Sequence, residues 1–169
     1  MSRSDLERVF RAEYPRVVAV ARRVLGDGDA AEDVAQEVFV SFAHSQVPAS
    51  GAAGWLSVAA VHTALNTLRG SRRRRGREVR AEIDPARPLP DTAPDPADDV
   101  VRSLERARVR AALAALPQQQ AAVLVLRHSG LSYADIGAAL GIAASGVGTT
   151  LRRAEAALRE ELTREGSRR

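Results

Sequence analysis

Residues Leu131–Leu158, LSYADIGAALGIAASGVGTTLRRAEAAL, predict two short helices that are joined by a tight turn. Ser132 and Asp135 have the spacing of a capping box, in which two side chains satisfy free amides at a helix start. Gly141 supplies the left-handed residue that ends the first helix. The second helix has apolar residues on one face, namely Val147, Leu151, Ala154 and Leu158. This pattern is typical of a helix-turn-helix.

The second helix of this motif has small, polar and partly basic side chains opposite its apolar face. At about 100° per residue, that side holds Ser145, Gly148, Thr149 and Arg152, with Arg153 on its flank. Such a surface suits insertion into the major groove, which predicts that these residues bind DNA. The alternative is an ordinary helical hairpin with a solvated outer face, because this pattern also occurs in proteins that do not bind DNA.

Composition predicts an all-α protein with a polyanionic partner. The 169 residues are 45% apolar but only 4% aromatic, and no alternation of β-branched and polar residues predicts a strand. All 25 basic residues are arginine and the net charge is +4, which favours binding to a polyanion. The chain has no cysteine, which excludes a disulfide framework and a thiolate metal site. Without a signal peptide or a long apolar run, we expect a cytoplasmic protein with no membrane insertion.

The N-terminal part predicts two amphipathic helices. Ser4 and Glu7 have capping-box spacing for a helix over residues 4–25, and Asp29 is expected to begin the second helix. The expected buried stripe of the first helix is Leu6, Val9, Phe10, Val17, Val20 and Val24. A ridge on the second helix consists of Asp33, Gln36, Glu37 and Val40. Such an acidic ridge is usually a solvated face, but it can also dock a basic partner helix.

A third helix is predicted from Trp55 onward. Its expected core stripe is Val58, Val61, Leu65 and Leu68, and its flank holds Trp55, His62, Asn66, Arg69 and Arg73. An aromatic ring, hydrogen-bonding groups and guanidinium groups on one face suit an unpaired base and its phosphates. Alternatively, Trp55 anchors the core and the arginines are solvated. Residues 69–80 contain seven arginines and one glutamate, a density of charge that normally meets phosphate.

A linker rich in proline and aspartate is predicted at residues 81–98. Five of the eight prolines lie between Pro85 and Pro96, so this stretch cannot build a core. It separates two predicted small helical domains, residues 1–80 and residues 99–169. In the second domain, a helix capped by Asp98 or Asp99 is predicted to carry Val101, Leu104, Ala111 and Leu113. The next helix follows Pro117 and should pack Val123, Leu124 and Leu126.

Four motifs in this order resemble those of a known family. EDVAQEVF at residues 32–39 is similar to EDLVQETF, and WLSVAAVHTALNTLRGSRRRR at residues 55–75 is similar to WLYRIARNLALDYLRRRRR. LPQQQAAVLVLRHSGLSYADIGAALGI, followed by SGVGTTLRRAEAALR, resembles the fourth conserved region of that family. Most of the chain thus resembles the extracytoplasmic-function (group IV) sigma factors of bacterial RNA polymerase, which are sigma-70-like. The resemblance implies a region 2 bundle and a region 4 helix-turn-helix.

The resemblance also implies partners and residue roles. In the family, the first motif docks on the clamp helices of the largest polymerase subunit, which implies that Asp33, Gln36 and Glu37 bind core RNA polymerase. The tryptophan helix melts the minus-ten element, which implies DNA contacts by Trp55, His62, Asn66, Arg69, Arg72 and Arg73. The helix-turn-helix binds the minus-thirty-five element, which implies contacts by Ser145, Gly148, Thr149, Arg152 and Arg153. Promoter DNA and an anti-sigma factor are further expected partners. No catalytic activity, cofactor, metal or small-molecule substrate is expected.

The sequence departs from the family pattern at several positions. His62 replaces a common asparagine, and imidazole has a different donor geometry. Gly148 and Thr150 stand where lysine and arginine are frequent, and Ala143 replaces a capping serine. The last three departures lie at the helix that the resemblance assigns to the minus-thirty-five element. The other classes lack support: a repressor needs a dimer interface or effector domain, and an enzyme needs a clustered site, whereas the three histidines are dispersed.

Overall fold

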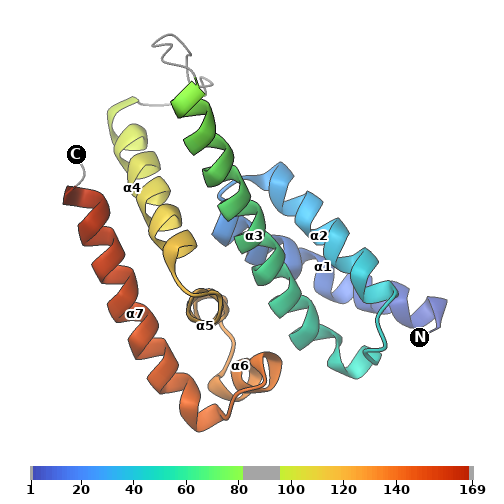
Figure 1. The fold of residues 1–169 in the computed structure, drawn as a ribbon. Helices are drawn as coiled ribbons and strands as arrows, with labels where there is room; N and C mark the ends of the chain where they lie inside the picture. Colours follow the sequence, from blue (N-terminus) through green and yellow to red (C-terminus); the bar gives the residue numbers. More distant parts are fainter. Residues whose placement is uncertain (1, 82–95, 168–169) are drawn as a thin grey trace.

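The computed structural model describes residues 2–81 and 96–167, and the regular structure in these two ranges is entirely helical (Figure 1). The elements are α1 (Arg3–Leu25), α2 (Gly28–Ala43), the 3-10 turn η1 (Ala49–Gly51), α3 (Ala52–Ala81), α4 (Pro96–Ala115), α5 (Gln118–His128), α6 (Tyr133–Leu140) and α7 (Ala144–Ser167). The prediction of an all-α fold is confirmed.

Local hydrogen bonds explain where the first two helices begin. Ser2 caps α1, because its Oγ accepts a hydrogen bond from the backbone N–H of Asp5 at 3.1 Å. The cap therefore lies two residues before the predicted capping box of Ser4 and Glu7. Asp27 caps α2 in the same way, through the N–H of Ala30 at 2.9 Å, so α2 begins before the expected Asp29. Each cap satisfies an amide that the helix itself leaves free.

The helices α1, α2 and α3 pack against one another around an apolar core. Val9, Val17, Val20 and Val24 are buried as predicted. Phe10 is not buried: 43% of it is exposed, and its ring lies against Tyr14 and Phe39 at the edge of the core. In α3, Val61 and Leu65 are buried, while Val58 and Leu68 are only partly buried. Three residues that were not in the predicted stripe, Leu56, Ala60 and Ala64, complete the buried face of α3.

In the C-terminal half, α4 runs antiparallel beside α7 (Figure 1). Of the apolar residues that the predicted helix carries, Val101 and Leu104 are 55% and 42% exposed. Burial in α4 is concentrated near its C-terminal end, at Ala112, Leu113 and Ala114. The helix begins at Pro96, so the last residues of the predicted linker are helical, whereas residues 82–95 lie outside the described ranges. The domain boundaries remain a prediction.

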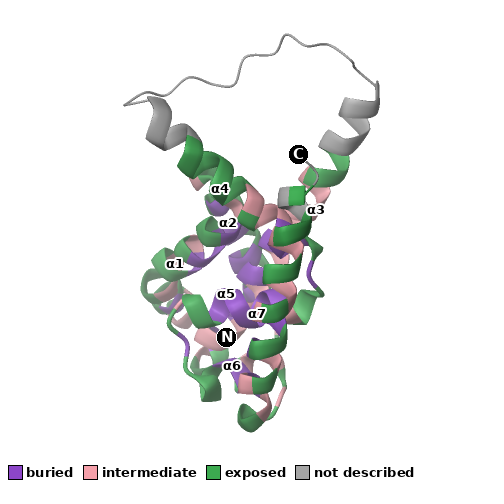
Figure 2. Cartoon of the chain, turned by 90° about the vertical axis from the view of Figure 1, so that its left-hand side faces the viewer, coloured by how far each residue is buried: buried purple, intermediate pink, exposed green. Residues whose placement is uncertain are grey.

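The two halves of the chain share one core. Helix α3 packs against α5 and α6, and α1 also contacts α5. Six consecutive residues of α5, numbers 121–126, are buried, which places this helix at the centre of the molecule (Figure 2). A helix that is apolar and buried on all sides has neighbours on every face. Within the described ranges, no single helix is long and apolar enough to cross a membrane, and one bent pair meets the criteria by length and composition only.

Candidate nucleic-acid interface

The helix-turn-helix forms as its sequence predicts. The Oγ of Ser132 accepts a hydrogen bond from the N–H of Asp135 at 3.1 Å, and the N–H of Ser132 donates to Asp135 Oδ2 at 3.3 Å. The hydrogen bonds from the side chain and backbone of Ser132 lower the pKa of Asp135. Gly141 ends α6 with a φ of 67°, a left-handed conformation. These bonds fix where α6 begins and ends, and thus how α7 is presented.

A second glycine allows the close approach of the turn to α6. A Cβ atom on Gly137 would lie 2.8 Å from the carbonyl oxygen of Ile142 and 3.2 Å from the backbone nitrogen of Ala144. Both of these neighbours are backbone atoms that cannot rotate away. The sequence interpretation missed this requirement, although a glycine between Ile136 and Leu140 in a helical pattern was a detectable signal.

The outer face of α7 is exposed where the sequence predicts it. On the inner face, Val147, Leu151 and Ala154 are buried. On the outer face, the exposed residues are Ser145, Thr149, Arg152 and Arg153. Gly148 differs from the expectation because it is half-buried, and a Cβ there would lie 3.4 Å from Tyr133 Cε2. Tyr133 is 43% exposed, and the guanidinium carbon of Arg127 lies 5.3 Å from its ring centroid. The sequence interpretation missed this cation–π pair, which borders the predicted DNA-binding face.

We expect opposite effects from alanine at the two glycines. Alanine is favoured over glycine inside a helix by about 1 kcal/mol. At Gly148 the neighbouring tyrosine ring is exposed and can shift, so Gly148→Ala should raise the free energy of unfolding. At Gly137 the neighbours are backbone, so Gly137→Ala should lower it by about 1–3 kcal/mol, the usual cost of overpacking. Urea unfolding followed by circular dichroism measures both changes. Equal changes in the two variants would contradict the close contact at Gly137.

The predicted minus-ten residues of α3 lie in mixed surroundings. The Trp55 ring is half-buried, and its centroid lies 5.6 Å from that of Phe42, so this side chain also anchors the core. Asn66 and Arg73 are exposed, and His62 is half-buried. Burial, and secondarily the positive charge of Arg69, lower the pKa of His62. His62 is therefore neutral at physiological pH, with one ring nitrogen as donor and the other as acceptor.

Two arginines of this face are already engaged with the other half of the chain. Arg69 donates from Nε to the carbonyl oxygen of Ala114 at 3.1 Å and from Nη2 to that of Leu116 at 2.8 Å. Arg72 donates to the carbonyl oxygen of Ala111. The carbonyl of Ala114 is one of the last four in α4, which have no partner within the helix and carry a partial negative charge, and Leu116 directly follows the end of α4. The alternative of merely solvated arginines is therefore wrong for Arg69, which is part-buried.

The acidic ridge on α2 is accessible at its two carboxylates. Asp33 and Glu37 are exposed, and Val40 beside them is 60% exposed. Gln36 lies between the carboxylates on the same ridge and is also exposed. An accessible ridge of two carboxylates with an adjoining apolar side chain has the chemistry of a docking surface for a basic helix. Polymerase binding by this ridge stays a prediction.

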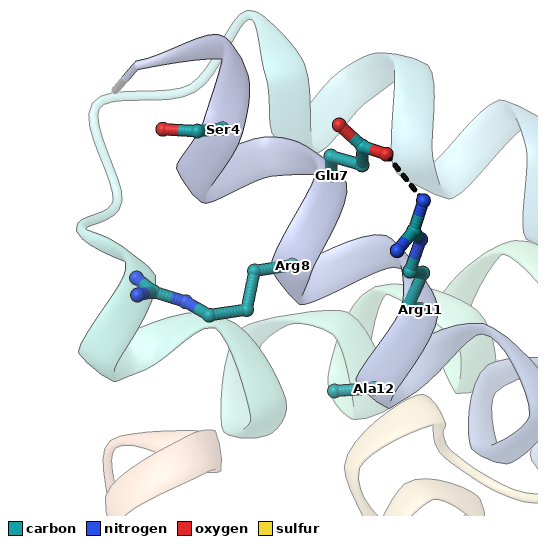
Figure 3. A pocket seen from close by; sticks show the side chains of 5 residues that line it. All are labelled: Ser4, Glu7, Arg8, Arg11 and Ala12. Atoms are coloured by element: carbon teal, nitrogen blue, oxygen red, sulfur yellow. Dashed lines mark hydrogen bonds and ion pairs between the residues drawn. The ribbon is translucent and has the colours of Figure 1, made fainter.

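A surface depression along α1 contains none of the predicted site residues (Figure 3). It is lined by Ser4, Glu7, Arg8, Arg11 and Ala12. Glu7 and Arg11 form an ion pair at 2.6 Å, while Arg8 extends to the other side of the helix and pairs with Asp5. These partners are exposed, and such pairs are typical of a solvated helix surface. In residues 2–81 and 96–167, no group of three or more His, Asp or Glu residues could hold a metal ion.

Comparison with known proteins gives the same two regions. The model of Sigma-70 region 2 matches residues 9–74, and that of Sigma-70, region 4 matches residues 106–158. RNA polymerase sigma factor YlaC of Bacillus subtilis is 30% identical over 170 residues, which cover 96% of this chain and 94% of the relative. ECF RNA polymerase sigma factor SigE of Mycolicibacterium smegmatis is 33% identical over 166 residues, covering 95% of this chain and 63% of the relative.

A solved structure has the same fold. The sigma factor RpoE, in a co-crystal structure with the anti-sigma factor NepR from Bartonella quintana, superposes with a TM-score of 0.51. The sequences are 24% identical, and the match covers 94% of this chain and 97% of that one. Family models for both regions, together with a relative matched over nearly its full length, establish membership. The chain belongs to the sigma-70-like RNA polymerase sigma factors of the extracytoplasmic-function group.

Proposed function

We propose that this chain directs core RNA polymerase to a specific set of promoters and opens the DNA there. The observation that carries most weight is the pairing of a region 2 bundle and a region 4 helix-turn-helix in one chain. In this proposal the exposed ridge of Asp33, Gln36 and Glu37 docks on the clamp helices of the polymerase. The polymerase synthesises the RNA, and the sigma factor itself regulates initiation and is not an enzyme. Its place of action is the cytoplasm, with the polymerase.

The proposed DNA contacts divide between the two regions. In region 2, Trp55, His62 and Asn66 would bind an unpaired base of the minus-ten element, since a ring and two hydrogen-bonding groups suit that task. Arg69, Arg72 and Arg73 would hold phosphates. In region 4, the outward side chains of Ser145, Thr149, Arg152 and Arg153 would enter the major groove. Gly148 would contribute backbone only, because its side is covered by Tyr133.

An anti-sigma factor is a further proposed partner. The support is the likeness in fold to a sigma factor whose structure was determined with an anti-sigma factor bound.

Reconstitution with core polymerase tests the proposal. The chain should co-purify with core enzyme, and run-off transcription across genomic fragments should give transcripts from discrete start sites only when the chain is present. A gel shift with and without core enzyme separates this function from that of an independent repressor. A repressor would bind its operator without core enzyme, and that result would contradict the proposal.

The lowered pKa of His62 predicts how the stability of the fold depends on pH. The ordinary histidine pKa is about 6.5, and the folded protein resists the proton more than the unfolded chain does. The stability that this group contributes is therefore complete above about pH 6.5 and is lost as the pH falls below it. His62→Gln should reduce the drop in melting temperature between about pH 7 and about pH 5. An NMR titration midpoint of His62 at or above the ordinary value would contradict this prediction.

A further inference from the structure

An aromatic ring from α6 lies against the first turns of α7. The two helices pack against each other on either side of the turn that joins them (Figure 1). A Cβ atom on Gly148 would lie 3.4 Å from Cε2 of Tyr133, so the ring contacts α7 at a position that has no side chain. Tyr133 is nevertheless 43% exposed. The ring is therefore part of the surface of the helix-turn-helix as well as part of its packing.

The position of Gly148 places this ring beside the exposed face of α7. At about 100° per residue, Gly148 and Arg153 lie about 40° and about 100° to opposite sides of Arg152. Thr149 lies between these two flanks and is exposed, as is Arg152. Tyr133 thus borders the outward residues on the flank that Gly148 leaves without a side chain, and Arg153 borders them on the other.

A guanidinium group accompanies the ring. Arg127 at the end of α5 is exposed, and its guanidinium carbon lies 5.3 Å from the ring centroid of Tyr133. Its Nη1 donates to the carbonyl oxygen of Leu131 at 3.2 Å, which holds the side chain in this place. The other N–H groups of a guanidinium and the hydroxyl of a tyrosine are hydrogen-bond donors. A cation and a hydroxyl donor on one exposed surface have the chemistry that binds a phosphate group.

We propose that Tyr133 and Arg127 bind a phosphate of the duplex at the edge of the minus-thirty-five element, and that Gly148 positions the ring for this contact. The inference rests on the proposed function, because only that function brings duplex DNA to α7. Arg127 supplies the charge, and the hydroxyl of Tyr133 donates a hydrogen bond. Gly148 acts through Tyr133, because its missing side chain leaves the space in which the ring lies. Phosphate contacts fix the register of a protein on the duplex, so this pair sets how Arg152 and Arg153 meet the bases.

Titration of labelled promoter DNA with the chain and core enzyme tests the two contacting residues. Tyr133→Phe keeps the ring and removes the hydroxyl, so it should weaken binding at least about tenfold, as expected for a hydrogen bond to a charged group. The loss should be equal on all single-base variants of the minus-thirty-five element. Arg127→Ala should also reduce the slope of log affinity against log salt concentration by about 1, because one phosphate contact is lost. Tyr14→Phe and Arg11→Ala remove the same groups from α1 and should bind as the wild type does.

A double-mutant cycle tests the positioning role of Gly148. Alanine adds only a Cβ at ordinary contact distance from the ring, so Gly148→Ala should bind the promoter as the wild type does. Valine fills two of the three staggered positions on that Cβ, so Gly148→Val should displace the ring and weaken binding about as much as Tyr133→Phe does. Added to Tyr133→Phe, Gly148→Val should cause little further loss, because both changes remove the same contact. Circular dichroism establishes that each variant is folded.

Each contrary result has a defined meaning. Unchanged binding by either Tyr133→Phe or Arg127→Ala overturns the phosphate contact. A loss confined to particular base pairs overturns it as well, because a phosphate contact carries no sequence information. Additive losses for Gly148→Val and Tyr133→Phe mean that valine collides with the DNA itself, which overturns the positioning role. All of these results leave the proposed function intact, whereas failure of the wild type to bind promoters together with core enzyme overturns that function.

Discussion

Replacing Asp33 and Glu37 together with arginine is expected to weaken binding to core RNA polymerase by a few kcal/mol. Both carboxylates are exposed on one ridge of α2, so the replacements should not disturb the core. They place positive charges where the proposed partner helix is basic, and like charges brought together at an interface are costly. Titration of fluorescently labelled protein with core enzyme measures the loss of affinity. Circular dichroism establishes whether the variant is folded.

A control variant with the same change in net charge shows whether the loss of binding depends on the ridge itself. Glu105 and Glu160 are also exposed, on α4 and α7, so neither belongs to the ridge on α2. Glu105→Arg with Glu160→Arg should bind core enzyme almost as the wild type does. Normal binding by a folded Asp33→Arg, Glu37→Arg variant would mean that another surface docks on the polymerase.

The parts of the fold that were predictable from sequence are those fixed by neighbours within a few residues. Ser132, Asp135 and Gly141 were assigned correctly because a capping box and a left-handed helix end involve residues that are three or four positions apart. The cap of α1 was misplaced to Ser4 because Ser2 offers the same spacing with Asp5, and both pairs satisfy the pattern. Only the backbone conformation decides between two such candidates.

Burial was less predictable where it depends on a distant neighbour. Periodicity shows that Phe10, Val101 and Leu104 lie on apolar stripes, but not whether another helix covers each position. Gly148 was placed on the outer face by its angle alone, whereas Tyr133 from α6 lies over it. The hydrogen bonds of Arg69 could not be predicted from sequence either, since its acceptors lie 45 and 47 residues further along the chain. The sequence predicted the positive charge of α3 correctly, but not that Arg69 contacts the carbonyl groups of Ala114 and Leu116.

The exposed arginines of α7 are expected to determine most of the preference for the minus-thirty-five sequence. Arginine can donate two parallel hydrogen bonds to guanine, and each such pair discriminates against other bases by about 1–3 kcal/mol. Ser145 and Thr149 make less selective bonds, and Gly148 has no side chain to contribute. Arg152→Ala or Arg153→Ala should therefore abolish discrimination at one or two adjacent base pairs, a reduction of about tenfold to a hundredfold.

Transcription from a panel of single-base variants of the minus-thirty-five element distinguishes the roles of the two arginines. Arg159→Ala is the matched control, because Arg159 lies on the same helix and pairs with Glu155 at 3.8 Å. If Arg152 or Arg153 binds a base, its replacement alters the profile at particular positions, whereas removal of a phosphate anchor lowers every promoter about equally. A uniform fall would make both arginines phosphate anchors. An unchanged profile in both variants would mean that sequence preference comes from the minus-ten contacts of α3, where His62 would then be the residue to replace.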